Sequence, residues 1–130
     1  MEKTKKNKII IIDDEIEFAE LLSDRLSLRG FETEYVTNHF EALKLAEQKK
    51  FDIAIIDVKL KGINGIELMK LLLQIQPKLK VILITGHGTE EEKQRGLAFG
   101  ASRYLVKPID IENLKIEILN LFETDKNGQI

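Results

Sequence analysis

The sequence contains no cysteine, and long hydrophobic runs are absent from it. Without cysteine the chain cannot form disulfides, thiolate metal sites or a thiol nucleophile. Its longest apolar runs, such as 9–12, 53–56 and 81–84, are far shorter than the roughly 20 residues that a membrane span requires. The basic start, residues 3–8, leads into four isoleucines and then three acidic residues, which is not the pattern of an export signal. We therefore expect a cytoplasmic protein without a membrane anchor.

Neither sign of charge dominates the composition. The 20 Lys and Arg residues nearly balance the 22 Asp and Glu residues, which gives a formal net charge of −2. This balance argues against direct nucleic-acid binding by this domain. With 43% hydrophobic and 32% charged residues over 130 positions, the composition is typical of one globular domain. We expect a basic N-terminal segment over 1–7, the domain over 8–122, and a polar tail over 123–130.

Short apolar runs alternate with longer stretches in which apolar residues recur three and four positions apart, as in alternating strands and helices. The five predicted strands cover residues 8–13, 32–36, 52–57, 80–84 and 102–106. The first, third and fourth are apolar on both faces, which is typical of the middle of a parallel sheet, whereas the second and fifth are mixed and suit its edges. The pattern predicts an α/β fold with a doubly wound, five-stranded parallel sheet in the order 2-1-3-4-5, the (βα)5 flavodoxin-like arrangement.

Capping residues indicate where the helices begin and end. Residues that favour helix starts precede four of the helical stretches, namely Asn38, Asn64, Thr89 and Asp110. Thr89 is followed three positions later by Glu92, which fits the capping box. Gly30 and Gly100 stand where a left-handed residue would end the first and fourth helices. We expect the last helix to end near Phe122.

Carboxylates follow two strands that the predicted order makes neighbours. The first strand ends in Asp13 and Asp14, and the third ends in Asp57. Ligands of such sheets bind at the carboxyl ends of the central strands. Three carboxylates in one pocket repel one another and would take up protons unless a cation is present. Oxygen ligands without Cys or a His pair favour a hard cation, Mg²⁺ before Ca²⁺.

Each of these residues also has an ordinary explanation. Asp is common after a strand because it caps the next helix, Thr85 could sit in a glycine-rich turn, and Lys107 could be a solvated amine. However, all of them fall at the same edge of the predicted sheet, with the Lys107-Pro108 pair beside them. This coincidence favours one site over several independent ones.

Four segments resemble the receiver domains of two-component response regulators, and they occur in the family's order and near its spacing. They are IIIIDDE (9–15), DVKLKGINGIEL (57–68), TGHG (85–88) and YLVKP (104–108). The resemblance covers roughly residues 7–122. It implies that Asp57 accepts a phosphoryl group from a sensor histidine kinase or a phosphotransfer protein, in a Mg²⁺-dependent phosphorelay reaction.

The resemblance also assigns roles around Asp57. It implies that Asp14 and Asp57 ligate Mg²⁺ directly, that Asp13 does so through water, and that the backbone carbonyl of Lys59 completes the protein ligands. Lys107 would pair with the phosphoryl oxygens.

Further residues would transmit the phosphorylation signal. Thr85 would move in to hydrogen-bond a phosphoryl oxygen, and the switch residue Tyr104 would turn inward. The face formed by the fourth helix, fifth strand and fifth helix would then contact a partner, an output domain or a second copy of the chain. The Lys107-Pro108 bond is expected to be cis.

Two residues flank the site where the family tunes the lifetime of the phosphoryl group, Lys59 and His87. Our hypothesis is that the Lys59 amine lies over the phosphoryl oxygens and excludes attacking water, which slows self-dephosphorylation. Position 61 is Lys where the family commonly has Pro, so the loop after Asp57 should be less stiff.

Two other functions compete with this interpretation. A Mg²⁺-dependent phosphatase or phosphotransferase with an Asp nucleophile, as in haloacid-dehalogenase-like enzymes, would have a second acid where this chain has Lys59, and the chain has no room for a substrate cap. A receiver-like binding module that is never phosphorylated would lack Asp57, an acidic pair or Lys107, and all are present. We therefore expect a protein that catalyses only its own phosphorylation and dephosphorylation.

Overall fold

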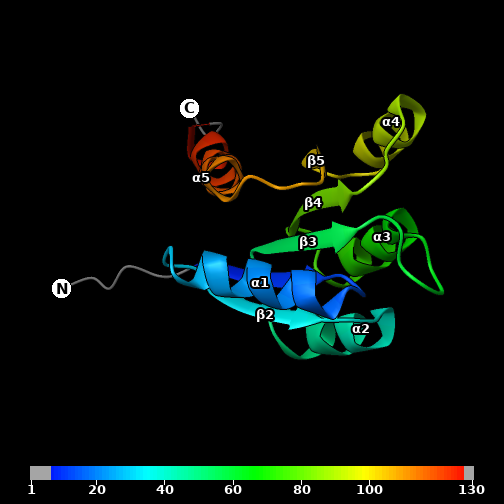
Figure 1. The fold of residues 1–130 in the computed structure, drawn as a ribbon, viewed down its shortest axis with the longest axis horizontal. Helices are drawn as coiled ribbons and strands as arrows, with labels where there is room; N and C mark the ends of the chain where they lie inside the picture. The colour runs from blue at the N-terminus through cyan, green and yellow to red at the C-terminus, as the bar shows by residue number, and fades with distance from the viewer. Residues whose placement is uncertain (1–6, 128–130) are drawn as a thin grey trace.

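The computed structural model describes the backbone of residues 7–127 and the side chains of residues 7–122. Five parallel strands form one sheet in the order β2-β1-β3-β4-β5, which confirms the predicted fold and strand order (Figure 1). The strands are β1 (Lys8–Ile12), β2 (Glu32–Val36), β3 (Ile53–Asp57), β4 (Lys80–Thr85) and β5 (Arg103–Val106). The helices are α1 (Ile16–Ser27), α2 (His39–Gln48), α3 (Gly65–Ile75), α4 (Glu90–Ala98) and α5 (Ile111–Asn127).

Helices cover both faces of the sheet because the central strands are apolar on both sides. In β1, Ile10 and Ile12 pack in a core with α2 and α3, whereas Ile9 and Ile11 pack in a second core with α1 and α5. All four isoleucines are buried. Burying one such side chain contributes about 1.5–3 kcal/mol to the free energy of folding. Because these isoleucines point to both faces, β1 packs against both helix layers. The outer strands β2 and β5 are more exposed, as expected for edges.

The predicted caps form, with one difference. The side chains of Asn38, Asn64 and Asp110 each accept a hydrogen bond from a backbone N–H at the start of the following helix. Thr89 Oγ1 likewise accepts from the N–H of Glu92 at 3.1 Å. A capping box would have the Glu92 carboxylate accept from the Thr89 N–H, but the hydrogen bond that it makes is with a tyrosine on β5.

The helix ends agree with the sequence except at α5. Gly30 and Gly100 have the positive φ angles of +97° and +124° that favour glycine, and they follow α1 and α4. Helix α5 continues to Asn127 rather than ending near Phe122. Residues 123–127 contain neither Gly nor Pro, so nothing in their sequence stops the helix before Gly128. The rest of the expected tail, 128–130, and residues 1–6 lie outside the described residues.

Candidate phosphoryl-acceptor and metal site

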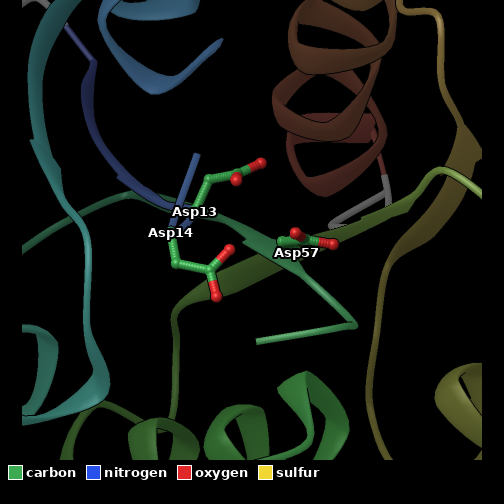
Figure 2. Close-up of side chains that lie close together, drawn as sticks. All are labelled: Asp13, Asp14 and Asp57. Atoms are coloured by element: carbon green, nitrogen blue, oxygen red, sulfur yellow. The ribbon is translucent and has the colours of Figure 1, made fainter. Parts of the chain in front are cut away.

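Three carboxylates meet at the carboxyl edge of β1 and β3. Asp13 and Asp14 follow β1, Asp57 ends β3, and these two strands pair side by side. One oxygen from each of the three lies within 4.8 Å of the others (Figure 2). Asp13 and Asp57 are buried, whereas Asp14 is half-buried. The structure therefore brings together the three acids that the sequence placed at this edge.

Burial is the main electrostatic feature of this cluster. It raises the pKa of Asp57 above the ordinary value of 3.8, and the charges of Asp14 and Glu15 add to the rise. The backbone N–H of Lys59, which donates to Asp57 Oδ1 at 3.2 Å, and the Lys107 amine oppose it. Crowded carboxylates in a poorly solvated site need a nearby positive charge to stay ionised at neutral pH.

Asp13 experiences the same opposition of effects. Its burial raises the pKa, while the N–H of Glu15, which donates to Asp13 Oδ1 at 2.9 Å, lowers it. The nearby charge of Asp57 raises the pKa of Asp13 further, and Lys107 lowers it. This Glu15 N–H stands directly before α1, so Asp13 combines part of the helix-start role with its place in the cluster.

Lys107 supplies the positive charge from the end of β5. Its amine lies 3.1 Å from Asp13 Oδ2, 2.9 Å from Glu15 Oε1 and 3.8 Å from Asp57 Oδ2. Burial alone would lower the pKa of Lys107, but hydrogen bonds to Glu15 and Asp13 outweigh it and raise the pKa. The amine therefore stays protonated at neutral pH. The Lys107-Pro108 peptide bond is cis, as expected.

The donor set fits a hard divalent cation. The three acids offer only oxygen atoms, which is the preference of Mg²⁺ and Ca²⁺. Asp14 is held toward the site because its Oδ2 accepts a hydrogen bond of 2.9 Å from the backbone N–H of Lys61. Proline at position 61 would have no N–H to donate. The lysine that departs from the family pattern therefore makes a contact with a candidate metal ligand.

Thr85 and His87 occupy the neighbouring loop after β4. Thr85 ends the strand and is fully buried, and its Oγ1 accepts a hydrogen bond of 3.3 Å from the His87 N–H. His87 itself is exposed. Thr85 thus directly follows Ile84, which pairs with Asp57 across β3 and β4, whereas His87 is exposed to solvent.

Tyr104 on β5 is half-buried and packs against the core that β4 and α3 share. Its hydroxyl donates a hydrogen bond of 2.6 Å to Glu92 Oε1. Burial, together with this hydrogen bond and the Glu92 charge, raises the pKa of Tyr104 above its ordinary value. Tyr104 therefore remains a neutral donor at physiological pH.

Sequence reasoning missed three contacts near the site. Glu15 pairs with Lys107, the Phe18 ring lies 4.3 Å from the Lys107 amine, and Glu92 joins Tyr104 to Lys59. Glu15 stands in the acidic triplet of the sequence, which was a usable signal. Phe18 and Glu92 looked like ordinary helix residues, because their partners are distant in the chain.

Comparisons with known proteins agree with this geometry. Residues 9–119 match the family described as the response regulator receiver domain. The chain is 33% identical over 114 residues to the probable transcriptional regulatory protein SilR of Salmonella typhimurium, covering 88% of this chain and 50% of that protein. It is 30% identical over 108 residues to sporulation initiation phosphotransferase F of Bacillus subtilis, covering 83% and 87%. The chain thus spans only half the length of SilR but most of the second relative.

Solved structures give the same result. A CheY-like receiver domain protein of Methanospirillum hungatei superposes with a TM-score of 0.89 at 27% identity, covering 95% of this chain and 99% of that chain. A response regulator of Burkholderia pseudomallei, solved with a phosphorylated aspartic acid, calcium ion and citrate, has a TM-score of 0.81 at 28% identity, covering 94% and 75%. Within the described residues, none of the helices is long and apolar enough to cross a membrane. Fold, acidic edge and sequence together assign the chain to the response regulator receiver domain family of two-component signal transduction systems.

Proposed function

We propose that Asp57 is the residue that accepts the phosphoryl group, from the phosphohistidine of a sensor histidine kinase or a phosphotransfer protein. The observation that carries this proposal is the buried Asp57 carboxylate at the end of β3, with the Lys107 amine 3.8 Å from its Oδ2 and two further acids beside it. The Burkholderia relative, whose structure contains a phosphorylated aspartic acid, supports the same chemistry.

The reaction is a direct transfer between two side chains. An ionised Asp57 oxygen attacks phosphorus, the bond from phosphorus to the donor's histidine nitrogen breaks, and an acyl phosphate forms. The carboxylate has no proton to lose, so no general base is required. Phosphoryl transfer proceeds through a loose transition state with charge on its equatorial oxygens, and positive groups fixed near those oxygens stabilise it. Lys107 is such a group.

Mg²⁺ is the metal that we infer for the acidic edge. Asp14 and Asp57 would hold it directly, Asp13 through water, and the Lys59 carbonyl would complete the protein ligands. The bound ion would supply charge neutralisation to the transferring phosphoryl group. The Burkholderia relative was solved with a calcium ion, which supports a divalent cation as the ligand of these acids.

Lys107 and Thr85 would bind the phosphoryl group once it forms. Phosphorylation adds about −1.5 to −2 charges and three acceptor oxygens beside them. Lys107 would pair with those oxygens, and the Thr85 hydroxyl would leave the His87 N–H to donate to one of them. Tyr104 would follow the loop inward, as the switch residue of the domain. Lys59 and His87 would tune the lifetime of the phosphoryl group.

The signal would leave through the face formed by α4, β5 and α5. Exposed apolar side chains occur on each of these elements, namely Leu97, Val106, Ile116 and Leu119. We infer that this face contacts an output domain, a partner protein or a second copy of the chain. Sedimentation equilibrium with and without beryllofluoride, a stable phosphoryl mimic, tests the dimer. A monomer at high concentration in both conditions would contradict it.

We also infer that the receiver unit over 8–122 catalyses only its own phosphorylation and dephosphorylation, and that it works in the cytoplasm. The family assignment supports the first point, because receivers act on their own aspartate. Residues 1–7 and 123–130 would flank this unit without taking part in the chemistry.

Incubation with Mg²⁺ and acetyl phosphate, followed by intact mass measurement, tests the proposal. We expect wild type to gain the mass of one phosphate, and Asp57→Ala to gain none. Asp52→Ala, which removes an aspartate at the opposite end of β3, should still be modified. Phosphate on Asp57→Ala, or none on wild type, would contradict the assignment.

A further inference from the structure

One carboxylate, that of Glu92 in α4, contacts side chains from two other parts of the fold. Its Oε1 accepts the 2.6 Å hydrogen bond from the Tyr104 hydroxyl on β5. Its Oε2 lies 3.5 Å from the Nζ atom of Lys59, in the loop that follows Asp57. Glu92 therefore connects the loop beside the proposed acceptor to the strand that carries the proposed switch residue.

Local structure fixes Glu92 in this position. Its N–H donates to Thr89 Oγ1 at 3.1 Å, and it lies in the first turn of α4, where the helix dipole favours a carboxylate. Its side chain is only 15% exposed, whereas the adjacent Glu90 and Glu91 are exposed. Of the three glutamates, Glu92 is the one that accepts the hydrogen bond from Tyr104 on β5.

Tyr104 is also held in place. Its hydroxyl lies so close to Gly88 that a Cβ at this position would collide with it. The Thr85 methyl group would also lie 2.8 Å from that Cβ. The phenol therefore fills the space over the loop after β4, and its hydroxyl donates a hydrogen bond to Glu92 on the α4 side.

The contact with Glu92 determines where the Lys59 amine lies. The backbone N–H of Lys59 donates to Asp57 Oδ1 at 3.2 Å, but its side chain pairs with Glu92. Among the described residues, the amine within 4.0 Å of Asp57 is that of Lys107. The backbone of Lys59 thus contacts Asp57, whereas its side chain points away from Asp57 toward Glu92.

We propose that Glu92 is a positioning residue that restrains the Lys59 amine away from Asp57 and links this restraint to the Tyr104 hydroxyl. The proposal rests on Asp57 being the phosphoryl acceptor. A phosphoryl group at Asp57 brings about −1.5 to −2 charges close to Lys59 and competes with Glu92 for the amine. The Lys59–Glu92 pair must break for the amine to reach the phosphoryl oxygens, so the pair weakens phosphoryl binding. When the amine leaves, Tyr104 is the remaining partner of Glu92. A change at Asp57 therefore also reaches the Tyr104 hydroxyl on β5, by a route separate from Thr85.

Affinity for beryllofluoride in the presence of Mg²⁺ tests the restraint. We expect Glu92→Gln, which keeps the shape of the side chain, to bind the mimic about two- to fivefold more tightly, the size of a surface ion pair. Glu91→Gln removes the same charge one residue away from an exposed position and should leave the affinity unchanged. In a Lys59→Met background, Glu92→Gln should produce no gain, because the amine that it releases is absent.

Tyrosine fluorescence tests the link to β5. The chain has two tyrosines and no tryptophan, so in a Tyr35→Phe background the signal comes from Tyr104 alone. Addition of beryllofluoride should change this signal, and Lys59→Met should reduce the change by about half or more, because the carboxylate then has no amine to release.

The outcomes separate the two proposals. Equal effects of Glu92→Gln and Glu91→Gln, or a gain in affinity that persists with Lys59→Met, would overturn the role of Glu92 and leave the acceptor assignment standing. A fluorescence change that is identical with and without Lys59 would overturn the link to Tyr104. Failure of wild type to bind the mimic at all would overturn both the acceptor assignment and the role of Glu92.

Discussion

The Lys107 ammonium lies 3.1 Å from Asp13 Oδ2, which joins two residues that are 94 positions apart in the chain. The aspartate is fully buried and the lysine side chain is only 17% exposed. A buried carboxylate without a nearby cation is strongly unfavourable, so this pair is a condition for keeping the acidic edge ionised. The same amine also lies near Asp57, where it would face the phosphoryl group.

Lys107→Gln should therefore lower both stability and phosphoryl retention. Loss of the amine leaves Asp13 unpaired, and we expect the free energy of unfolding to fall by about 3 kcal/mol at pH 7. Urea denaturation checks this value. Lys44→Gln, which removes an exposed lysine from α2, should change stability by less than about 0.5 kcal/mol. Similar decreases in the free energy of unfolding of the two variants would show that the Lys107–Asp13 pair does not stabilise the fold.

Asp57→Asn should stabilise the metal-free protein at neutral pH. The pKa of Asp57 is raised in the folded state, so the native protein binds more protons than the unfolded chain as pH rises above 3.8. Stability contributed by this residue is therefore lost as pH rises through its folded pKa. We expect a gain of about 1–3 kcal/mol for the variant, the cost of an imperfectly solvated buried polar group.

Denaturation over a series of pH values checks this sign. The advantage of Asp57→Asn should shrink toward acid pH and vanish well below 3.8, where the wild-type carboxyl is protonated in both states. Asp24→Asn, at an exposed position of α1, should show no such trend. An advantage that grows toward acid pH would contradict the raised pKa.

Mg²⁺ should raise the unfolding temperature of the wild type. A ligand that binds only the folded state, at a concentration 100 times its Kd, adds about 2.7 kcal/mol of stability. Asp14→Asn should abolish most of this effect, because Asp14 is one of the proposed direct ligands. Thermal unfolding with MgCl₂ and with NaCl at matched ionic strength distinguishes binding from screening. An equal rise in the variant would contradict the site.

Phe18→Leu should remove a cation–π contact that helps to position the Lys107 amine. The Phe18 ring lies 4.3 Å from the ammonium, a cation–π contact that contributes about 0.5–2 kcal/mol. Leucine keeps an apolar side chain at the edge of the core but lacks the ring, so we expect a stability loss at least in that range and weaker binding of beryllofluoride. The control is Phe40→Leu, since Phe40 is 73% exposed on α2. Unchanged mimic affinity in Phe18→Leu would rule out a positioning role for the ring.

Lys59→Asn should shorten the lifetime of the phosphoryl group if the amine excludes attacking water. A decrease of about 1 kcal/mol in the hydrolysis barrier raises the rate about fivefold. Release of phosphate from the phosphorylated protein, followed by intact mass over time, measures this rate. Lys61→Asn is a matched control, because it changes an exposed lysine in the same loop and keeps the backbone N–H that Asp14 accepts. A slower or unchanged rate in Lys59→Asn would reject the hypothesis.

The sequence by itself predicted the architecture and the acidic edge. Each strand was predicted to within one residue at each end, because continuous apolar runs and capping residues are local signals. The sheet order then placed Asp13, Asp14 and Asp57 together, since parallel strands end at the same edge. The end of α5 was missed because its residues past Phe122 have no strong pattern, only the absence of a helix breaker.

Only the tertiary structure decided how the charged groups pair. Glu92 had the sequence signature of a capping box, yet its carboxylate contacts Tyr104 and Lys59. Phe18 packs against the core that α1 and α5 share, and its ring also faces the amine of Lys107, which is distant in the chain. Long side chains reach several partners from one backbone position, and the choice depends on which opposite charges and donors the fold brings near. Periodicity therefore determines which face a residue occupies, while the partner of its charged end depends on contacts between distant segments.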